Sequence, residues 1–89
     1  MDNDNKKLEE LNEIQNRVSI AETTVNYKND LSLTLSGRLE LKDIKISNDF
    51  LKNEKVFIEQ VFTKVFNAAI IEAKRVHQEI VTEGLLEIA

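Results

Sequence analysis

The chain has 89 residues and a formal net charge of −4, and we expect residues 1–89 to form a single domain. Cys is absent, which excludes disulfides and thiolate metal sites, and with only one His we expect no metal and no other cofactor. Hydrophobic residues make up 42% and charged residues 31%, which are globular proportions. No apolar run approaches the roughly 20 residues that a bilayer requires, and no secretory signal is visible. These features predict a cytoplasmic protein without membrane contact.

The first predicted element is a helix over residues 4–21, with its N-cap at Asp4 or at one of the two residues before it. Its apolar residues recur at gaps of three, three and four, which places Leu8, Leu11, Ile14 and Val18 on one face. The other faces are strongly charged. Because this apolar seam is narrow, we expect the helix to dock against another element rather than to form the core.

Strict alternation of apolar and polar residues then predicts three antiparallel strands, over residues 23–27, 31–35 and 39–46. A three-residue loop at 28–30 would place Tyr27 opposite Leu31. In the second hairpin we expect Gly37 in the left-handed conformation.

This second hairpin would pair Leu33 with Leu39 and Leu31 with Leu41. The apolar positions then change from odd to even, which predicts a β-bulge near Lys42 and Asp43.

A long helix is predicted over residues 54–83, ended by Gly84, with Phe50 and Leu51 as anchors on the turn before it. Two apolar rows follow this helix. The first, expected to be the core seam, contains Phe62, Phe66, Ala69, Ala73, Val76 and Ile80, and the second contains Phe57, Val61, Val65 and Ala68. This is more apolar surface than one sheet can cover, so we expect a second chain to contact it. The overall prediction is an α+β fold: N-terminal helix, three-stranded antiparallel meander, long C-terminal helix.

The sequence argues against an enzyme and against a small-molecule substrate. The adjacent carboxylates Glu9 and Glu10 are typical of a solvated helix face, and His77 fits a partly exposed helix position. The Ser36-Gly37 pair lacks the frame of a nucleophile elbow. With two glycines in the whole chain, there is no Gly-rich phosphate loop.

Basic residues on the two helices are the candidates for phosphate contact: Lys6, Lys7, Arg17, Lys64, Lys74 and Arg75. Their alternative role is solubility and pairing with carboxylates four residues away, as for Arg75 and Glu79.

The chain resembles the YbaB/EbfC family of bacterial nucleoid-associated proteins. The similarity rests on the order of elements, on the segment from Leu31 to Gly37, on the strand ending Ile44-Lys-Ile-Ser47, and on Val65-Phe-Asn-Ala-Ala69 within the last helix. The family shows an "Ile-x-Ile" strand and an "Ala-Phe-Asn-Asp-Ala" helix core at these places. The resemblance covers nearly the whole chain.

The resemblance implies a homodimer with a shared sheet and protruding helices that binds double-stranded DNA in the nucleoid. Binding would use phosphate contacts from the six basic residues, with modest sequence preference. Residues expected at the dimer interface are Leu8, Leu11, Val18, Ile70 and Ile71. The alternative is a dimeric adaptor that holds a protein partner and does not bind DNA.

Overall fold

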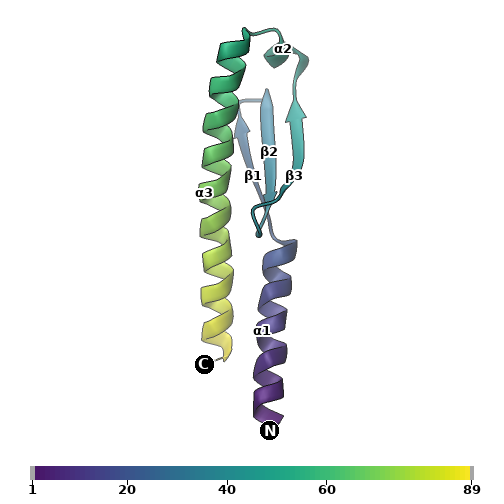
Figure 1. Ribbon diagram of the computed structural model, residues 1–89, viewed down its shortest axis with the longest axis vertical. Helices are drawn as coiled ribbons and strands as arrows, with labels where there is room; N and C mark the ends of the chain where they lie inside the picture. Colours follow the sequence, from purple (N-terminus) through teal and green to yellow (C-terminus); the bar gives the residue numbers. More distant parts are fainter. Residues whose placement is uncertain (1, 89) are drawn as a thin grey trace.

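A computed structural model describes residues 2–88, with side chains from Lys6 onward, and confirms the predicted α+β fold of an N-terminal helix, a three-stranded antiparallel sheet and a long C-terminal helix (Figure 1). The strands follow one another in the order β1-β2-β3. The elements are α1 (Asp2–Ile20), β1 (Glu22–Tyr27), β2 (Leu31–Ser36), β3 (Leu41–Ile46), α2 (Asn48–Leu51) and α3 (Lys55–Ile88).

The first hairpin has the predicted register. Tyr27 faces Leu31 and Val25 faces Leu33, so the apolar residues of β1 and β2 share one side of the sheet. On the other side, the hydroxyl oxygens of Thr24 and Thr34 lie 2.8 Å apart in a cross-strand hydrogen bond.

The second hairpin differs from the prediction. Leu33 pairs with Ile44 and Leu35 with Leu41, because the turn between the strands is longer than expected. The Ser36 hydroxyl closes this turn by accepting hydrogen bonds from the backbone N–H groups of Arg38 and Glu40, each at 3.2 Å. The predicted bulge is confirmed: Thr34 faces Asp43 while Leu35 faces Leu41, which leaves Lys42 as the extra residue.

Gly37 does not adopt the left-handed conformation, which falls instead on Leu39 with φ 65°. The glycine is needed for a different reason. A Cβ built at Gly37 would lie 2.0 Å from the carbonyl oxygen of Val18, so only glycine lets the hairpin approach the end of α1 this closely. The Gly37 N–H donates to the carbonyl of Ala21 at 3.0 Å and ties the two segments together.

α2 connects the sheet to α3. The Ser47 hydroxyl caps α2 by accepting from the Phe50 N–H at 3.1 Å, and it donates to the Asp30 carboxylate at 2.8 Å. Phe50 is buried, as predicted for an anchor, and its ring packs edge-on against Tyr27 with centroids 6.2 Å apart. Leu51, the second predicted anchor, is exposed.

The core lies between β2 and α3. Leu31, Leu33 and Leu35 of β2 are buried against four residues of α3: Val61, Val65, Ala69 and Ala73. The predicted seam was therefore wrong for its two phenylalanines, because Phe62 and Phe66 are half-buried beside this row rather than within it. Ala68 of the second predicted row is exposed.

Both helix ends differ from the predictions. α1 begins at Asp2, so Asp4 lies inside the helix and is not its N-cap. α3 continues through Gly84 to Ile88, so Gly84 does not end it. Gly84 is buried where α1 lies close against α3, and a Cβ on it would lie 2.5 Å from Cγ1 of Ile14.

The molecule is a rod of 62 × 17 × 16 Å with a radius of gyration of 17.6 Å. A compact domain of this length would have a radius of gyration of about 12 Å. The lower half of the rod, in the view of Figure 1, is an arm made only of α1 and the C-terminal half of α3.

Candidate functional site

One side of β3 is apolar and uncovered. α3 packs against β1 and β2, and β3 is the edge strand beyond it. The β3 residues that share the apolar side with Leu31, Leu33 and Leu35 are consequently exposed: Leu41 to 42%, Ile44 to 41% and Ile46 to 43%. A helix is about 10 Å wide and three strands span about 14 Å, so a single helix cannot cover this sheet.

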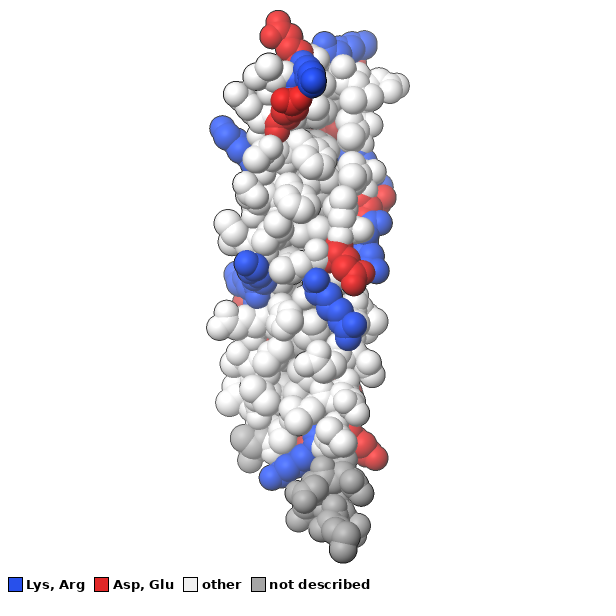
Figure 2. Space-filling view, viewed as in Figure 1, with Lys and Arg blue, Asp and Glu red and all other residues white. Residues whose placement is uncertain are grey.

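α3 adds a second apolar row beside its buried row. Side chains four residues apart lie above one another on a helix, and Ile58, Phe62, Phe66 and Ile70 form such a row. All four are half-buried, and the rings of Phe62 and Phe66 stack with centroids 6.3 Å apart. We refer to Leu41, Ile44 and Ile46 together with Phe62 and Phe66 as the open apolar face. Figure 2 shows that charged side chains on this side of the rod lie mainly near its upper end and at mid-height, with uncharged surface between these places.

The exposed area of the chain is larger than that of a compact monomer. The chain exposes 6663 Å². A compact monomer of 10.2 kDa exposes about 5,300 Å². The excess exceeds the roughly 800 Å² per partner that a stable protein–protein interface buries. The excess belongs to the whole rod, including its arm, and the open apolar face is one part of it.

The residues that the sequence predicted for the dimer interface are scattered in the structure. Val18 is only 1% exposed and packs inside the single chain, so it belongs to the core and not to an interface. Ile70 is half-buried in the row described above, whereas Ile71 is exposed on the outer side of α3. Leu8 and Leu11 are exposed on the arm. Leu41, Ile44 and Ile46 of β3 were not among the predicted interface residues, although a three-stranded sheet is wider than one helix and so leaves an edge strand uncovered.

Arg75 is occupied by neighbouring carboxylates. Its guanidinium donates to Glu72, with Nε 2.9 Å from the carboxylate oxygen, and also to Glu79. The hydrogen bond to Glu72 is the main reason that the pKa of Arg75 is raised, and the same bond lowers the pKa of Glu72. A residue that already serves two carboxylates has little capacity left for a phosphate.

Arg17 is also engaged. It bridges α1 to the end of α3 through Glu87 at 3.2 Å, and Glu13 lies 3.6 Å away on α1. The hydrogen bond to Glu87 is the largest contribution to its raised pKa. Arg17 therefore acts first as a link between the two helices of the arm.

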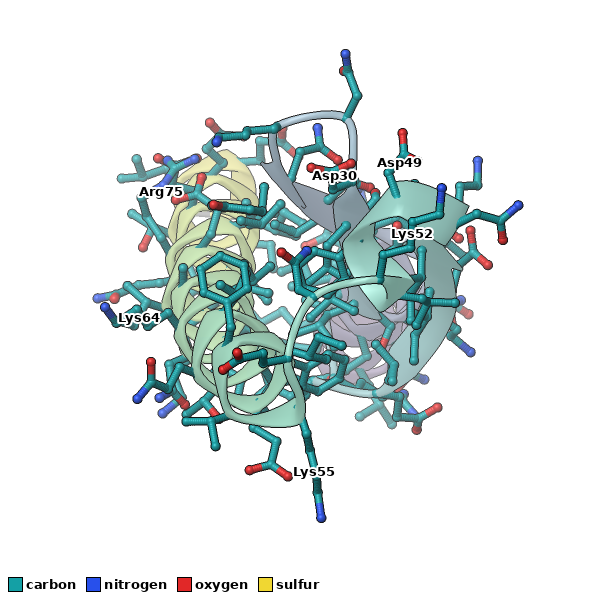
Figure 3. All side chains as sticks on the ribbon, turned by 90° about the horizontal axis from the view of Figure 1, so that it is seen from above. Asp30, Asp49, Lys52, Lys55, Lys64 and Arg75 are labelled. Carbon is teal, nitrogen blue, oxygen red and sulfur yellow. The ribbon has the colours of Figure 1, made fainter. Side chains whose placement is uncertain are left out.

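Lys64 and Lys74 are exposed on α3, and neither is in an ion pair among the described side chains. Figure 3 shows Lys64 and Arg75 extending from the side of α3 that faces away from the sheet. Lys6 and Lys7 are exposed near the start of α1, at the far end of the arm. The structure thus does not gather the six predicted basic residues into one patch, but distributes them along the rod.

The residues considered for catalysis have structural surroundings. His77 Nδ1 lies 2.9 Å from the carbonyl oxygen of Gly37, which makes that nitrogen a donor and links α3 to the β2–β3 turn. Among the described side chains, no group of three or more potential ligands is placed to hold a metal ion. Ser36 is buried and uses its hydroxyl to close the turn.

No family model matches this chain, and no curated protein matches it either. Within residues 2–88, none of the helices combines the length and the apolar character that crossing a membrane would require.

Proposed function

We propose that the chain acts as a homodimer that binds double-stranded DNA in the nucleoid through phosphate contacts with modest sequence preference. The observation that supports a dimer is the open apolar face, which remains uncovered in a single chain. A second copy offers the same apolar residues in return, as a two-fold interface requires.

The charge of the middle of α3 supports DNA as the partner. Although the whole chain is acidic, residues 60–79 carry a net charge of +1, from Lys64, Lys74 and Arg75 against Glu72 and Glu79. Arg75 pairs with both of these carboxylates. Lys64 and Lys74 are thereby left as the side chains best placed for phosphates, and a dimer would present two such segments.

A salt titration of binding to a random-sequence duplex tests this proposal. Each phosphate contact contributes about −0.9 to the slope of log K against log salt, so four lysines per dimer would give a slope of about −3.6. Lys74→Ala removes two contacts per dimer and should flatten the slope by about 1.8. Lys52→Ala is the matched control, because Lys52 is exposed at the C-cap of α2 and paired with Asp49 at 3.3 Å.

The second candidate is a dimeric adaptor for a protein partner. The arm favours it, because Leu8 and Leu11 of α1 and Leu85 and Leu86 of α3 are exposed. Absence of any shift of a random duplex at low salt and micromolar dimer would reject DNA binding and leave the adaptor role.

A further inference from the structure

The turn between β2 and β3 holds a leucine in an unfavourable backbone conformation. Leu39 has φ 65°, in the left-handed region that glycine and asparagine adopt most readily. Its side chain is 39% exposed and belongs to neither of the buried clusters of the core. Because backbone strain of this kind is found mainly at binding and functional sites, a strained leucine outside the core indicates a role at the surface.

Hydrogen bonds from several parts of the chain fix this turn. The Leu39 N–H donates to the carbonyl of Ser36 at 2.9 Å, in addition to the two bonds that the Ser36 hydroxyl accepts. Gly37 is held from two sides, by the carbonyl of Ala21 at 3.0 Å and by Nδ1 of His77 at 2.9 Å. Leu39 is therefore held at a defined position in the absence of a partner, and such preorganisation reduces the entropy that binding costs.

An open groove of about 520 Å³ lies between Leu39 and the second half of α3. Val81 is the apolar residue on the α3 side, and His77 and Lys74 also line the groove. This volume lies within the range of ligand-binding cavities, which combine apolar walls with a few polar groups. Since the groove is open on one side, it fits a single side chain of a partner better than an enclosed small molecule.

The free charges at the groove are positive. Lys74 lines it, and Arg38 precedes Leu39 in the turn. Both are exposed, and neither forms an ion pair with another described side chain. Glu40, the carboxylate of this turn, is already paired with Lys42 at 3.6 Å. A ligand complementary to the groove therefore carries an apolar side chain with negative charge beside it.

We propose that the groove between Leu39 and Val81 docks a peptide segment of a partner protein, in which a leucine-sized side chain is flanked by carboxylates. The apolar side chain fills the groove, and a carboxylate pairs with Lys74. This inference rests on the second candidate function, the adaptor, and adds to it a site and a partner chemistry. Its test contains no DNA, so it can fail without the DNA-binding proposal and the reverse.

An NMR titration of the isotope-labelled protein with the probe acetyl-Glu-Leu-Glu-amide tests the docking site. The largest shifts should occur at Leu39, His77 and Val81. Acetyl-Glu-Ala-Glu-amide should bind at least about tenfold more weakly, because it lacks the side chain that fills the groove. The neutral probe acetyl-Gln-Leu-Gln-amide should bind about threefold more weakly, as expected for the loss of exposed ion pairs.

Two variants separate docking from folding. Leu39→Asn removes the apolar wall but keeps a residue that tolerates the left-handed conformation, so it should stay folded by circular dichroism and bind the probe at least about tenfold more weakly. Lys74→Gln should weaken binding of the acidic probe about threefold and leave binding of the neutral probe unchanged. Lys55→Gln, the same change at the first residue of α3, is the control and should alter neither.

Three results would overturn the docking site: no shifts at millimolar probe, shifts centred elsewhere on the rod, or wild-type affinity in a folded Leu39→Asn. Equal weakening of the acidic and the neutral probe by Lys74→Gln would overturn the carboxylate pairing. The duplex titration described above decides on DNA binding independently of these outcomes.

Discussion

At the residue scale, Arg75 is a basic side chain whose charge is balanced by neighbouring carboxylates. The guanidinium is shared between Glu72 and Glu79, one turn away on either side, as residues three and four apart on a helix allow. Its hydrogen bond keeps the pKa of Glu72 below the ordinary value. The ion pair therefore contributes to stability above the ordinary carboxyl pKa of about 4.3, and that contribution is lost as the pH falls through the lowered pKa.

Removal of the guanidinium should release Glu72. In Arg75→Gln the titration midpoint of the Glu72 carboxyl should rise toward about 4.3, because the bond that favours its charged form is gone. A carbon-detected NMR titration measures the midpoint directly. Lys64→Gln, a change two turns away, should leave it where it is in the wild type. An unchanged midpoint in Arg75→Gln would mean that the bond does not form in solution.

Gly84 sets the distance between α1 and α3. Gly84→Ala should destabilise the fold by about 1–3 kcal/mol, because the new methyl group overlaps the Ile14 side chain. In an Ile14→Ala background that side chain is gone, so the same substitution should stabilise by up to about 1 kcal/mol through helix propensity. A double-mutant cycle by urea unfolding checks both signs. Equal effects in the two backgrounds would contradict this close approach of the two helices.

At the element scale, periodicity predicted the kind and order of every long element but not the ends that depend on tertiary contacts. The first hairpin follows from alternation and loop length alone. In the second, the Ser36 side chain stabilises a wider turn, which the expectation of a tight glycine turn did not include. Gly84 was predicted to end the long helix because glycine often follows the last helical residue, but α3 continues to Ile88. Its burial against Ile14 shows that its size, not its flexibility, is used.

The two apolar rows of α3 should respond differently to truncation. Phe66→Ala should weaken self-association by at least about tenfold, because Phe66 lies on the open apolar face. Leu33→Ala should instead lower the free energy of unfolding by about 2–5 kcal/mol, since Leu33 is fully buried within one chain.

Unfolding measured at several protein concentrations separates these effects. A concentration-independent loss for Phe66→Ala, as large as that for Leu33→Ala, would place Phe66 in the core of the single chain.

At the scale of the whole molecule, the sequence predicted a second chain, and of the five residues predicted for its interface the structure removes one from the surface, Val18. The apolar excess of α3 was visible in its periodicity. Which residues one chain covers depends on how far α3 reaches across the sheet, and that is a property of packing. In the single chain α3 leaves Ile44 and Ile46 exposed, while Val18 of α1 is buried beside Gly37. An arginine in a sequence can pair with a carboxylate or contact a phosphate. Residue type alone therefore did not show that Arg17 and Arg75 are engaged in ion pairs.

The mass of the wild-type protein in solution tests the central claim that a second copy covers the open apolar face. Sedimentation equilibrium at micromolar concentration should give about 20 kDa, twice the chain mass of 10.2 kDa, with no folded monomer in excess. Dilution should unfold the protein as it dissociates, because the uncovered chain exposes too much apolar surface. A well-folded species of 10.2 kDa that stays monomeric across this range would contradict the account.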